Sequence, residues 1–348
     1  MDKDACTWKL AVCGITLAFL TAGTARAGTF TYTNLTLPGG SSSMVNGIND
    51  SDQAVGTGTN VGTASHGFIW SNGQYTQVDV PGTIGGTIMI AINNNGIALG
   101  GLKSHLKFTK VITYNLATGK YAKFTTKISH PGGINVAGEV AGYSSSHKID
   151  YGVVGTPQQT TTLNEAPGVS TFAFGIADDG TVAGAYLTPF PADRSRTTYV
   201  GNGFTYKNGV FTTVNYPGYD QTVINVISSN GEVGGSYSNV PSGGGEFVES
   251  GGVFTNITYP GAFITEIGGI NSGGEVVGWW SMTDSSAQQG FIDVGGNYYN
   301  INPPGSVGTV ITGVNAKGSL VGFYQTALNG AYHGFIAQCA PNQVPCTQ

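Results

Sequence analysis

The ten residues Gly269-Ile270-Asn271-Ser272-Gly273-Gly274-Glu275-Val276-Val277-Gly278 contain the repeated unit that decides the fold. Related stretches start at Gly47, Ala91, Gly133, Gly175, Val226, Gly269 and Gly313, at separations of 44, 42, 42, 51, 43 and 44 residues. Self-similarity at a near-constant period of this length indicates an array of identical supersecondary units.

Each copy predicts a β-hairpin. Asn271 and Gly274 occupy the first and fourth positions of a type I turn, where the Asn side chain bonds the backbone and Gly accepts a positive φ. The apolar residues on either side then belong to the first two strands of the unit. The first copy has Asp52 in the glycine position, and Asp also tolerates the left-handed region.

Two further strands lie between successive copies. A third strand is visible at residues 66–70 and 203–206, and it ends in a tight turn such as Asn208-Gly209, a strong hairpin signal. An alternating fourth strand, such as 210–216, stops at a Pro-Gly pair, and the chain has seven such pairs. Four strands per roughly 40–45 residues is the pattern of a β-propeller blade.

The two ends of the array complete each other. The last copy has its first three strands, Thr309 to Ala337, but no fourth, whereas residues 28–39 form a lone fourth strand. Pairing this strand into the last blade removes two exposed sheet edges, and the chain lacks the polar capping repeats of an open solenoid. We therefore predict an all-β fold, a seven-bladed β-propeller over residues 28–337, closed by its N-terminal strand and followed by a tail at 338–348.

Residues 1–27 are predicted to be a secretory signal peptide. Lys3 and Lys9 precede an apolar run at 10–20 that is short for a membrane span, and Ala25-Arg26-Ala27 is an A-x-A cleavage site. We expect cleavage after Ala27 and a secreted protein, extracellular or periplasmic, with no membrane span. Cys339 and Cys346 then remain, and in an oxidising compartment they most simply form one disulfide.

Charged residues make up 9% of the chain, against about 25% in ordinary globular proteins. Without the leader, 11 Lys and Arg face 17 Asp and Glu, a net charge of −6. We expect a mildly acidic surface without a basic cluster, which argues against nucleic acid and anionic membranes as partners. We also expect a monomer.

The combination of G-I-N-x-x-G-x-V-x-G, H-G-F and G-x-F-T-x-V-x-Y-P-G resembles the HAF-type extracellular repeat family of bacterial secreted proteins. The resemblance covers residues 28–337, and His66 and His333 keep the histidine of that family. It implies a secreted, propeller-like protein and supplies no catalytic residues.

Glu266 is the first candidate for chemistry. The third residue before the repeat start is apolar in most copies, as in Met44, Ile88, Phe172, Val223 and Val310, whereas the sixth copy has Glu266. A carboxylate in such a row must find a partner or have a raised pKa. Asp220, in the equivalent connection one blade earlier, is predicted to share its ring face, and two converging carboxylates can cleave a glycosidic bond. The alternative is that Glu266 only pairs with a nearby amide or hydroxyl.

Aromatic residues follow the glycine of the second strand in five consecutive copies. They are Tyr143, Tyr186, Tyr237, Trp279, Trp280 and Tyr324, with Phe323 beside the last. Facing the ring mouth, they would form a platform for sugars; facing sideways, they would be packing between blades. The longest copy carries an insertion, 187–198, whose Arg194 and Arg196 are candidates to hold an acidic sugar, with ordinary length variation as the alternative.

We predict neither a metal nor a cofactor. The histidines lack H-x-x-H spacing, and the acidic turns at 49–52 and 178–180 lack the bidentate glutamate of a calcium loop. Three functions stay open. The first is a non-catalytic secreted propeller that binds a carbohydrate or a protein on one ring face. The second is a polysaccharide hydrolase or lyase, and the third is a purely structural surface protein.

Overall fold

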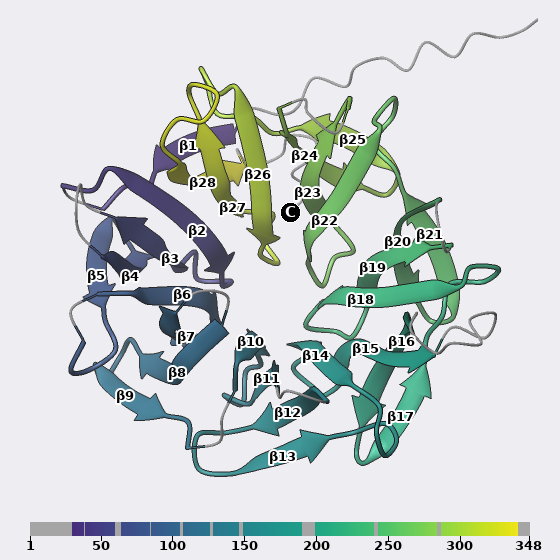
Figure 1. Ribbon diagram of the computed structural model, residues 1–348. Helices are drawn as coiled ribbons and strands as arrows, with labels where there is room; N and C mark the ends of the chain where they lie inside the picture. The colour runs from purple at the N-terminus through teal and green to yellow at the C-terminus, as the bar shows by residue number, and fades with distance from the viewer. Residues whose placement is uncertain are drawn as a thin grey trace, which may run out of the picture.

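The computed structural model describes residues 30–339 except 38, 60–63, 84, 105–106, 126–127, 146–148, 190–198, 240–242 and 284–286. The leader with its cleavage site, Arg194, Arg196 and Cys346 therefore lie outside the described residues. The chain forms a ring of seven four-stranded antiparallel sheets (Figure 1), which confirms the predicted fold class.

The blades follow each other in chain order. Blade 1 contains β2 (Ser42–Ile48), β3 (Ala54–Thr59), β4 (Ser65–Ser71) and β5 (Gln74–Val78). Blade 2 contains β6 (Thr87–Ile92), β7 (Ile97–Ser104), β8 (Lys107–Asn115) and β9 (Lys120–Lys123). Blade 3 contains β10 (His130–Ile134), β11 (Val140–Ser144), β12 (Tyr151–Gly155) and β13 (Thr160–Leu163). Blade 4 contains β14 (Thr171–Ile176), β15 (Val182–Pro189), β16 (Tyr199–Lys207) and β17 (Val210–Thr213).

Blade 5 contains β18 (Gln221–Ile227), β19 (Val233–Ser238), β20 (Gly244–Ser250) and β21 (Val253–Ile257). Blade 6 contains β22 (Ile264–Ile270), β23 (Val276–Ser281), β24 (Gln289–Val294) and β25 (Asn297–Asn300). Blade 7 contains β26 (Gly308–Val314), β27 (Leu320–Gln325), β28 (His333–Cys339) and, from the other end of the chain, β1 (Phe30–Asn34).

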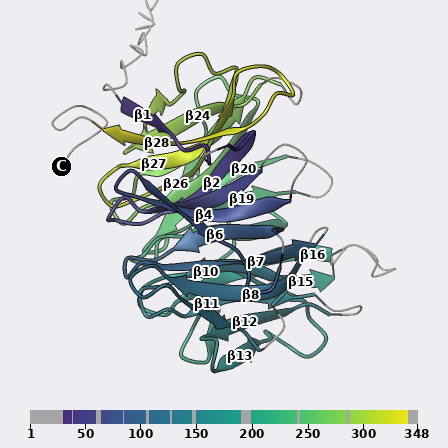
Figure 2. The same ribbon diagram turned by 90° about the vertical axis from the view of Figure 1, so that its left-hand side faces the viewer.

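The ring is closed by its first strand, as the sequence predicted. β1 lies beside β28 (Figure 2) and pairs with it antiparallel, from Phe30 opposite Cys339 to Asn34 opposite Phe335. Cys339 thus ends the strand that holds the ring shut. Because Cys346 lies outside the described residues, the disulfide stays a prediction.

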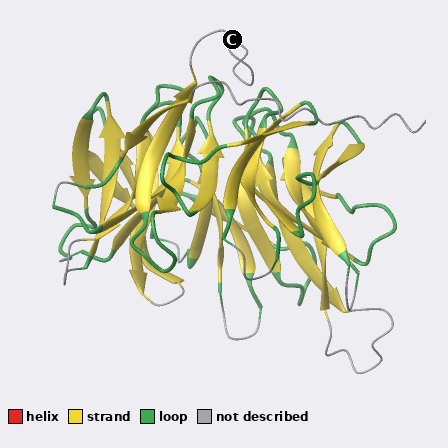
Figure 3. Ribbon diagram, turned by 90° about the horizontal axis from the view of Figure 1, so that it is seen from above, coloured by secondary structure: helices red, strands yellow, loops and turns green. Residues whose placement is uncertain are grey.

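Alternating strand directions give the ring two different faces (Figure 3). The first and second strands of each blade are joined by the Asn-containing turn, and the third and fourth by a tight turn; both turns lie on one side, which we call the turn face. The connections from second to third strand, and from each blade to the next, lie on the opposite side, which we call the connection face. The first strands surround the central channel (Figure 1).

The repeated asparagine joins neighbouring blades. Asn49 Oδ1 accepts the main-chain N–H groups of Ser51 and Gln53, both at 3.0 Å, and Asn49 Nδ2 donates to the carbonyl of Asn93 in the next blade at 2.9 Å. Asn93 bonds Asn135 in the same way at 2.7 Å. Asn271 bonds Asn315, and Asn315 bonds Asn49, each at 2.9 Å. One buried side chain therefore caps its own turn and bonds the next blade, which explains why five of the seven copies have Asn at this position; blades 4 and 5 have Ala177 and Ser228 instead.

The core lies between the blades and is built around the third strands. Their phenylalanines are at most 1% exposed: Phe68, Phe204, Phe247, Phe291 and Phe335. The preceding residue is glycine in blades 1, 4, 6 and 7, where a main-chain oxygen of the same blade and side chains of the next blade both approach closely. A Cβ on Gly67 would lie 2.8 Å from Met89 Cγ, and a Cβ on Gly290 would lie 3.0 Å from Ile311 Cδ1. Blade 5 departs from this pattern, with Glu246 in place of the glycine.

Candidate ligand-binding site

Glu266 lies on the first strand of blade 6, near the connection face. It is exposed, while the equivalent apolar residues of the other blades are half-buried. Partial burial nevertheless raises the pKa of its carboxyl. Its cross-strand partner is Trp279, and residues directly opposite in an antiparallel pair project from the same face of the sheet.

The carboxylate that interacts with Glu266 is Glu246, which the sequence reasoning missed. Glu246 is 5% exposed and accepts a hydrogen bond from the main-chain N–H of Ile267. Burial, followed by the negative charge of Glu266, raises its pKa from 4.5 to about 8. Since Glu246 stands where the repeat has the glycine before a buried phenylalanine, the departure from Gly-Phe to Glu246-Phe247 was a usable signal.

Glu246 also loosens the contact between blades 5 and 6. Ile267 is 9% exposed, whereas Ile224 and Ile311, at the same position in neighbouring blades, are fully buried. The glutamate side chain accounts for this difference, because blades 4 and 6 have glycine at the equivalent positions, Gly203 and Gly290.

Asp220 is the other predicted catalytic residue. It precedes β18, is exposed, and donates its main-chain N–H to Asn239 Oδ1 at 3.2 Å within its own blade. The catalytic roles of Asp220 and Glu266 stay predictions.

The aromatic residues of the second strands divide between two sides of the blades. Trp280 stacks on Tyr259 with the ring centroids 4.3 Å apart, and its Nε1 donates to Asn300 Oδ1 at 3.0 Å. Tyr237 stacks on Tyr216 at 3.9 Å. The Tyr186 hydroxyl lies 3.0 Å from Thr213 Oγ1. These side chains cover the end of their own blade and the connection that precedes it.

Trp279, Tyr143 and Phe323 stand one residue earlier in their strands and point the other way, since side chains alternate along a strand. Tyr143 stacks on His130 at 4.3 Å and meets Phe172 of the next blade edge-on at 5.0 Å. The aromatic residues therefore do not form one continuous row. Their roles as ligand contacts stay predictions, as do those of Arg194 and Arg196, which lie outside the described residues.

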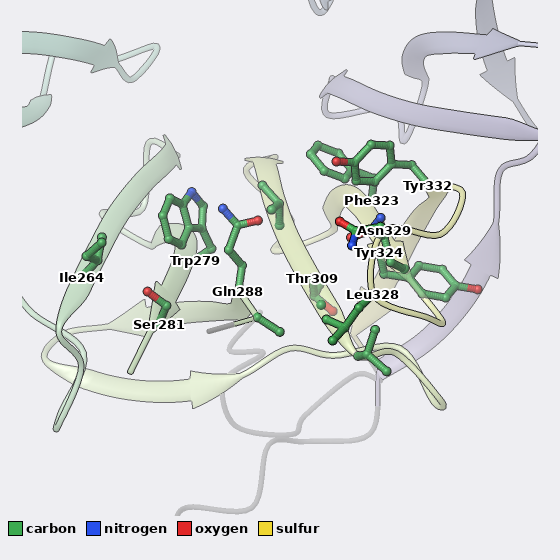
Figure 4. Close-up of a pocket in the computed structure, with 15 residues that line it drawn as sticks. Ile264, Trp279, Ser281, Gln288, Thr309, Phe323, Tyr324, Leu328, Asn329 and Tyr332 are labelled. Carbon is green, nitrogen blue, oxygen red and sulfur yellow. The ribbon is translucent and has the colours of Figure 1, made fainter. Parts of the chain in front are cut away.

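Trp279 and Tyr324 do line a common pocket. This pocket, which we call the seam pocket, lies between blades 6 and 7 at the connection face, with a volume of about 210 Å³ (Figure 4). Its lining includes Trp279, Gln288, Phe323, Tyr324, Asn329 and Tyr332, and none of the described lining residues is charged. Tyr332 is 40% exposed and meets Phe323 edge-on with the ring centroids 5.1 Å apart.

The walls of the seam pocket are held by hydrogen bonds. The Gln288 carbonyl accepts the N–H of Thr309 at 2.9 Å, which joins blade 6 to blade 7. Gln325 Nε2 donates to the Gly330 carbonyl at 2.6 Å, and the Tyr332 carbonyl accepts the N–H of Ser43 from blade 1 at 2.8 Å. These hydrogen bonds hold the main chain around the pocket in place. The side chain of Gln288 remains exposed.

A second hollow lies at the turn-face end of the channel. Isoleucines from several blades line it together with Asp50 and Asp178. Each aspartate accepts a main-chain N–H of a neighbouring turn at 2.8 Å, from Ala316 and Val136 respectively. These acidic turns therefore link blades. Within the described residues there is no group of three or more His, Cys, Asp or Glu side chains placed to hold a metal ion.

The histidine of blade 1 belongs to a repeated polar contact. His66 Nδ1 lies 2.9 Å from Asp79 Oδ2. The same two positions hold Asn202 with Asn215 in blade 4, and Gln289 with Asn302 in blade 6, each pair hydrogen-bonded at 2.9 Å. In these three blades the two polar side chains therefore join the start of the third strand to the end of the fourth, although the residue types differ.

The expectation that the chain has no basic cluster is wrong. Five lysines lie in blade 2: Lys103, Lys107, Lys110, Lys120 and Lys123. The sequence has no Asp or Glu between residues 80 and 138. The low overall charge concealed this local excess, which a blade-by-blade count of charges reveals.

The architecture defines the protein as a β-propeller, and the comparisons agree. No family model matches the chain, and no curated protein is detectably similar to it in sequence. Among solved structures, it is similar to the β-propeller domain of the Trilobed protease from Pyrococcus furiosus, with a TM-score of 0.55 and 10% identity over 86% of this chain and 94% of that one. That domain has an open velcro topology, whereas here β1 closes the last blade.

Two further structures share the fold. The virginiamycin B lyase from Staphylococcus aureus matches with a TM-score of 0.50 and 11% identity over 88% of this chain and 99% of that one. A puromycin hydrolase matches with a TM-score of 0.55 and 9% identity over 89% of this chain and 54% of that one. Identities this low establish the propeller fold alone, because one fold hosts many unrelated functions.

Among the described residues, no helix is long and apolar enough to cross a membrane.

Proposed function

We propose that this protein is a secreted, non-catalytic propeller that binds an uncharged carbohydrate in the seam pocket. The observation that carries the proposal is the composition of the pocket, where aromatic rings and amide side chains meet and no lining residue that the structure describes is charged. The A-x-A leader and the resemblance to HAF-type extracellular repeats support secretion.

The chemistry of a sugar fits this lining. The C–H face of a pyranose ring stacks on an indole or phenol ring, which offers a large apolar area at low entropic cost. Trp279 and Tyr332 supply such rings, and the side chains of Gln288 and Asn329 supply donors and acceptors for hydroxyl groups. A volume of about 210 Å³ lies below the usual range for drug-sized ligands, so the pocket suits one ring or the end of a glycan chain.

The hydrolase alternative has weaker support from the geometry. Glycoside cleavage requires two carboxyl groups that both reach the scissile bond. Of the two predicted carboxylates, Asp220 is bound through its main-chain N–H to Asn239 in blade 5. The carboxylate that interacts with Glu266 is instead Glu246, which is 5% exposed and does not reach a substrate unless blades 5 and 6 separate. We therefore favour binding over catalysis.

The test is a glycan array with the mature protein, followed by titration calorimetry on the best ligand. Trp279→Ala is expected to weaken binding about tenfold, the loss of one aromatic stacking contact together with its buried area. The control is Phe263→Ala, which removes a 66% exposed aromatic side chain of the same blade that does not line the pocket. Equal loss in both variants contradicts the assignment of the pocket.

The same experiment separates the three functions. Turnover of a bound polysaccharide that Glu266→Gln abolishes would establish a hydrolase or lyase. The absence of any saturable glycan ligand would overturn the proposal in favour of a protein ligand or a structural role.

A further inference from the structure

Blade 2 is the positively charged part of a negatively charged protein. Lys103 lies on β7, Lys107 and Lys110 on β8, and Lys120 and Lys123 on β9. Without the leader the chain has 11 Lys and Arg, so nearly half of them stand in one of seven blades. No acidic residue occurs between residues 80 and 138 to offset them.

These charges have no acidic partner in the described part of the chain. The ion pairs found there are His66 with Asp79 and Lys207 with Asp179, in blades 1 and 4. Four of the five lysines are exposed, and Lys110 is half-buried. β9 is the outermost strand of its blade, at the rim of the ring (Figure 1). The positive field of blade 2 therefore faces solvent.

Two of the lysines border a hollow with a particular lining. This hollow, which we call the blade-2 hollow, has a volume of about 510 Å³ and lies where β8 and the end of β9 meet the connection to blade 3. Lys110, Lys123, Thr109 and Thr125 supply its polar groups. Its remaining lining is apolar and at most 5% exposed: Val111, Phe124 and Ile128.

We infer that blade 2 is a second binding surface, which takes an acidic polysaccharide through the blade-2 hollow. The ammonium groups of Lys110 and Lys123 meet sugar carboxylates. The hydroxyls of Thr109 and Thr125 bond sugar hydroxyls. The outer lysines, such as Lys107, hold the chain to either side by charge alone.

The lining favours a polysaccharide over the other polyanions. The cluster contains no arginine, the residue whose planar fork best matches phosphate. Sequence-tolerant binding of single-stranded nucleic acid uses several stacked aromatic side chains, whereas Tyr121 is the single aromatic residue of β8 and β9 with substantial exposure, at 40%. Binding to an anionic membrane combines charge with exposed apolar side chains, and here the apolar residues form the floor of a hollow.

The experiment is affinity electrophoresis and titration with polygalacturonate at low and at physiological salt. We expect binding that weakens with salt, because counterions are released when lysines meet a polyanion. The double variant Lys110→Gln/Lys123→Gln is expected to bind about tenfold more weakly. Lys207→Gln serves as the control, since it also removes one cation, but one already paired with Asp179 in blade 4.

The other polyanions form the remaining arms of the test. Tighter binding to a single-stranded DNA oligonucleotide, or to phosphatidylserine vesicles, would overturn the inference. No binding to polygalacturonate, or the same affinity in the double variant, would overturn it as well. Should the double variant fail to fold, Lys103→Gln/Lys107→Gln removes two exposed positive charges of the same blade. Weaker binding to polygalacturonate is again expected, and unchanged binding would overturn the inference.

This inference is independent of the seam pocket. Trp279→Ala is expected to leave the affinity for polygalacturonate unchanged, because Trp279 lies between blades 6 and 7. Failure of either site therefore leaves the other standing.

Discussion

Replacing Glu246 by Gln is expected to stabilise the ring at neutral pH and to change its stability little near pH 4. The folded protein holds this carboxyl at a pKa of about 8, against an ordinary value of 4.5. Between these two values the folded state keeps a proton that the unfolded chain has released. The free energy of unfolding must therefore fall as pH rises through this window.

The magnitude follows from the size of the window. Near pH 7 the wild type loses on the order of 3 kcal/mol of its free energy of unfolding relative to low pH. Each pH unit above the pKa of the unfolded chain adds about 1.4 kcal/mol to this loss while Glu246 stays protonated in the folded state. Gln keeps the shape and can still accept the Ile267 N–H, but it has no proton to lose. Two other titratable groups interact with Glu246. The negative charge of Glu266 contributes to the raised pKa of Glu246. Tyr237, whose pKa Glu246 raises above its ordinary value, is protonated throughout this window.

The assay is urea unfolding of both proteins in a pH series from about 4 to 9. The account predicts stability curves that converge at low pH and separate as pH rises, with the substituted protein more stable. Glu165→Gln is the control, since it neutralises an exposed carboxylate in another blade. Parallel curves for wild type and Glu246→Gln, or a substituted protein that is less stable at every pH, would refute the reasoning.

Three further perturbations test the packing. Asn93→Ala is expected to cost about 2–3 kcal/mol in urea unfolding, since it leaves the buried carbonyl of Asn135 and two turn N–H groups without their partner; an unchanged midpoint contradicts the bonded ring. Gly203→Ala places a Cβ 2.3 Å from a main-chain oxygen and is expected to lower the melting temperature strongly, while Gly209→Ala, at a turn with open space around it, costs about 1 kcal/mol. Lys207→Gln breaks an ion pair whose side chains are about half exposed, so it should change stability by less than about 1 kcal/mol; a larger loss would show an unexpected structural role.

The sequence was sufficient for the ring because the evidence was repeated seven times. Each Asn-to-Gly turn and each Pro-Gly stop is a local signal, and the unmatched strand at each end predicts closure. The interactions between blades were harder to foresee. Glu246 and Glu266 meet only because the third strand of one blade packs on the first strand of the next.

The aromatic residues show a different limit. Trp279 and Trp280 are adjacent, so the alternation of side chains along a strand already requires them to face opposite sides. Which side forms a pocket depends on the neighbouring connection that carries Tyr332, and repeat spacing does not reveal this. The lysines of blade 2 were visible in the sequence, but a net charge summed over the whole chain hides a local excess.

Native-state hydrogen exchange across β1 tests the closed ring most directly. The account predicts that the main-chain N–H groups of β1 that pair with β28 exchange as slowly as those of the inner strands, and that both are released in one cooperative opening. Rapid exchange of β1 while β26 and β27 stay protected would contradict a ring held shut by its first strand.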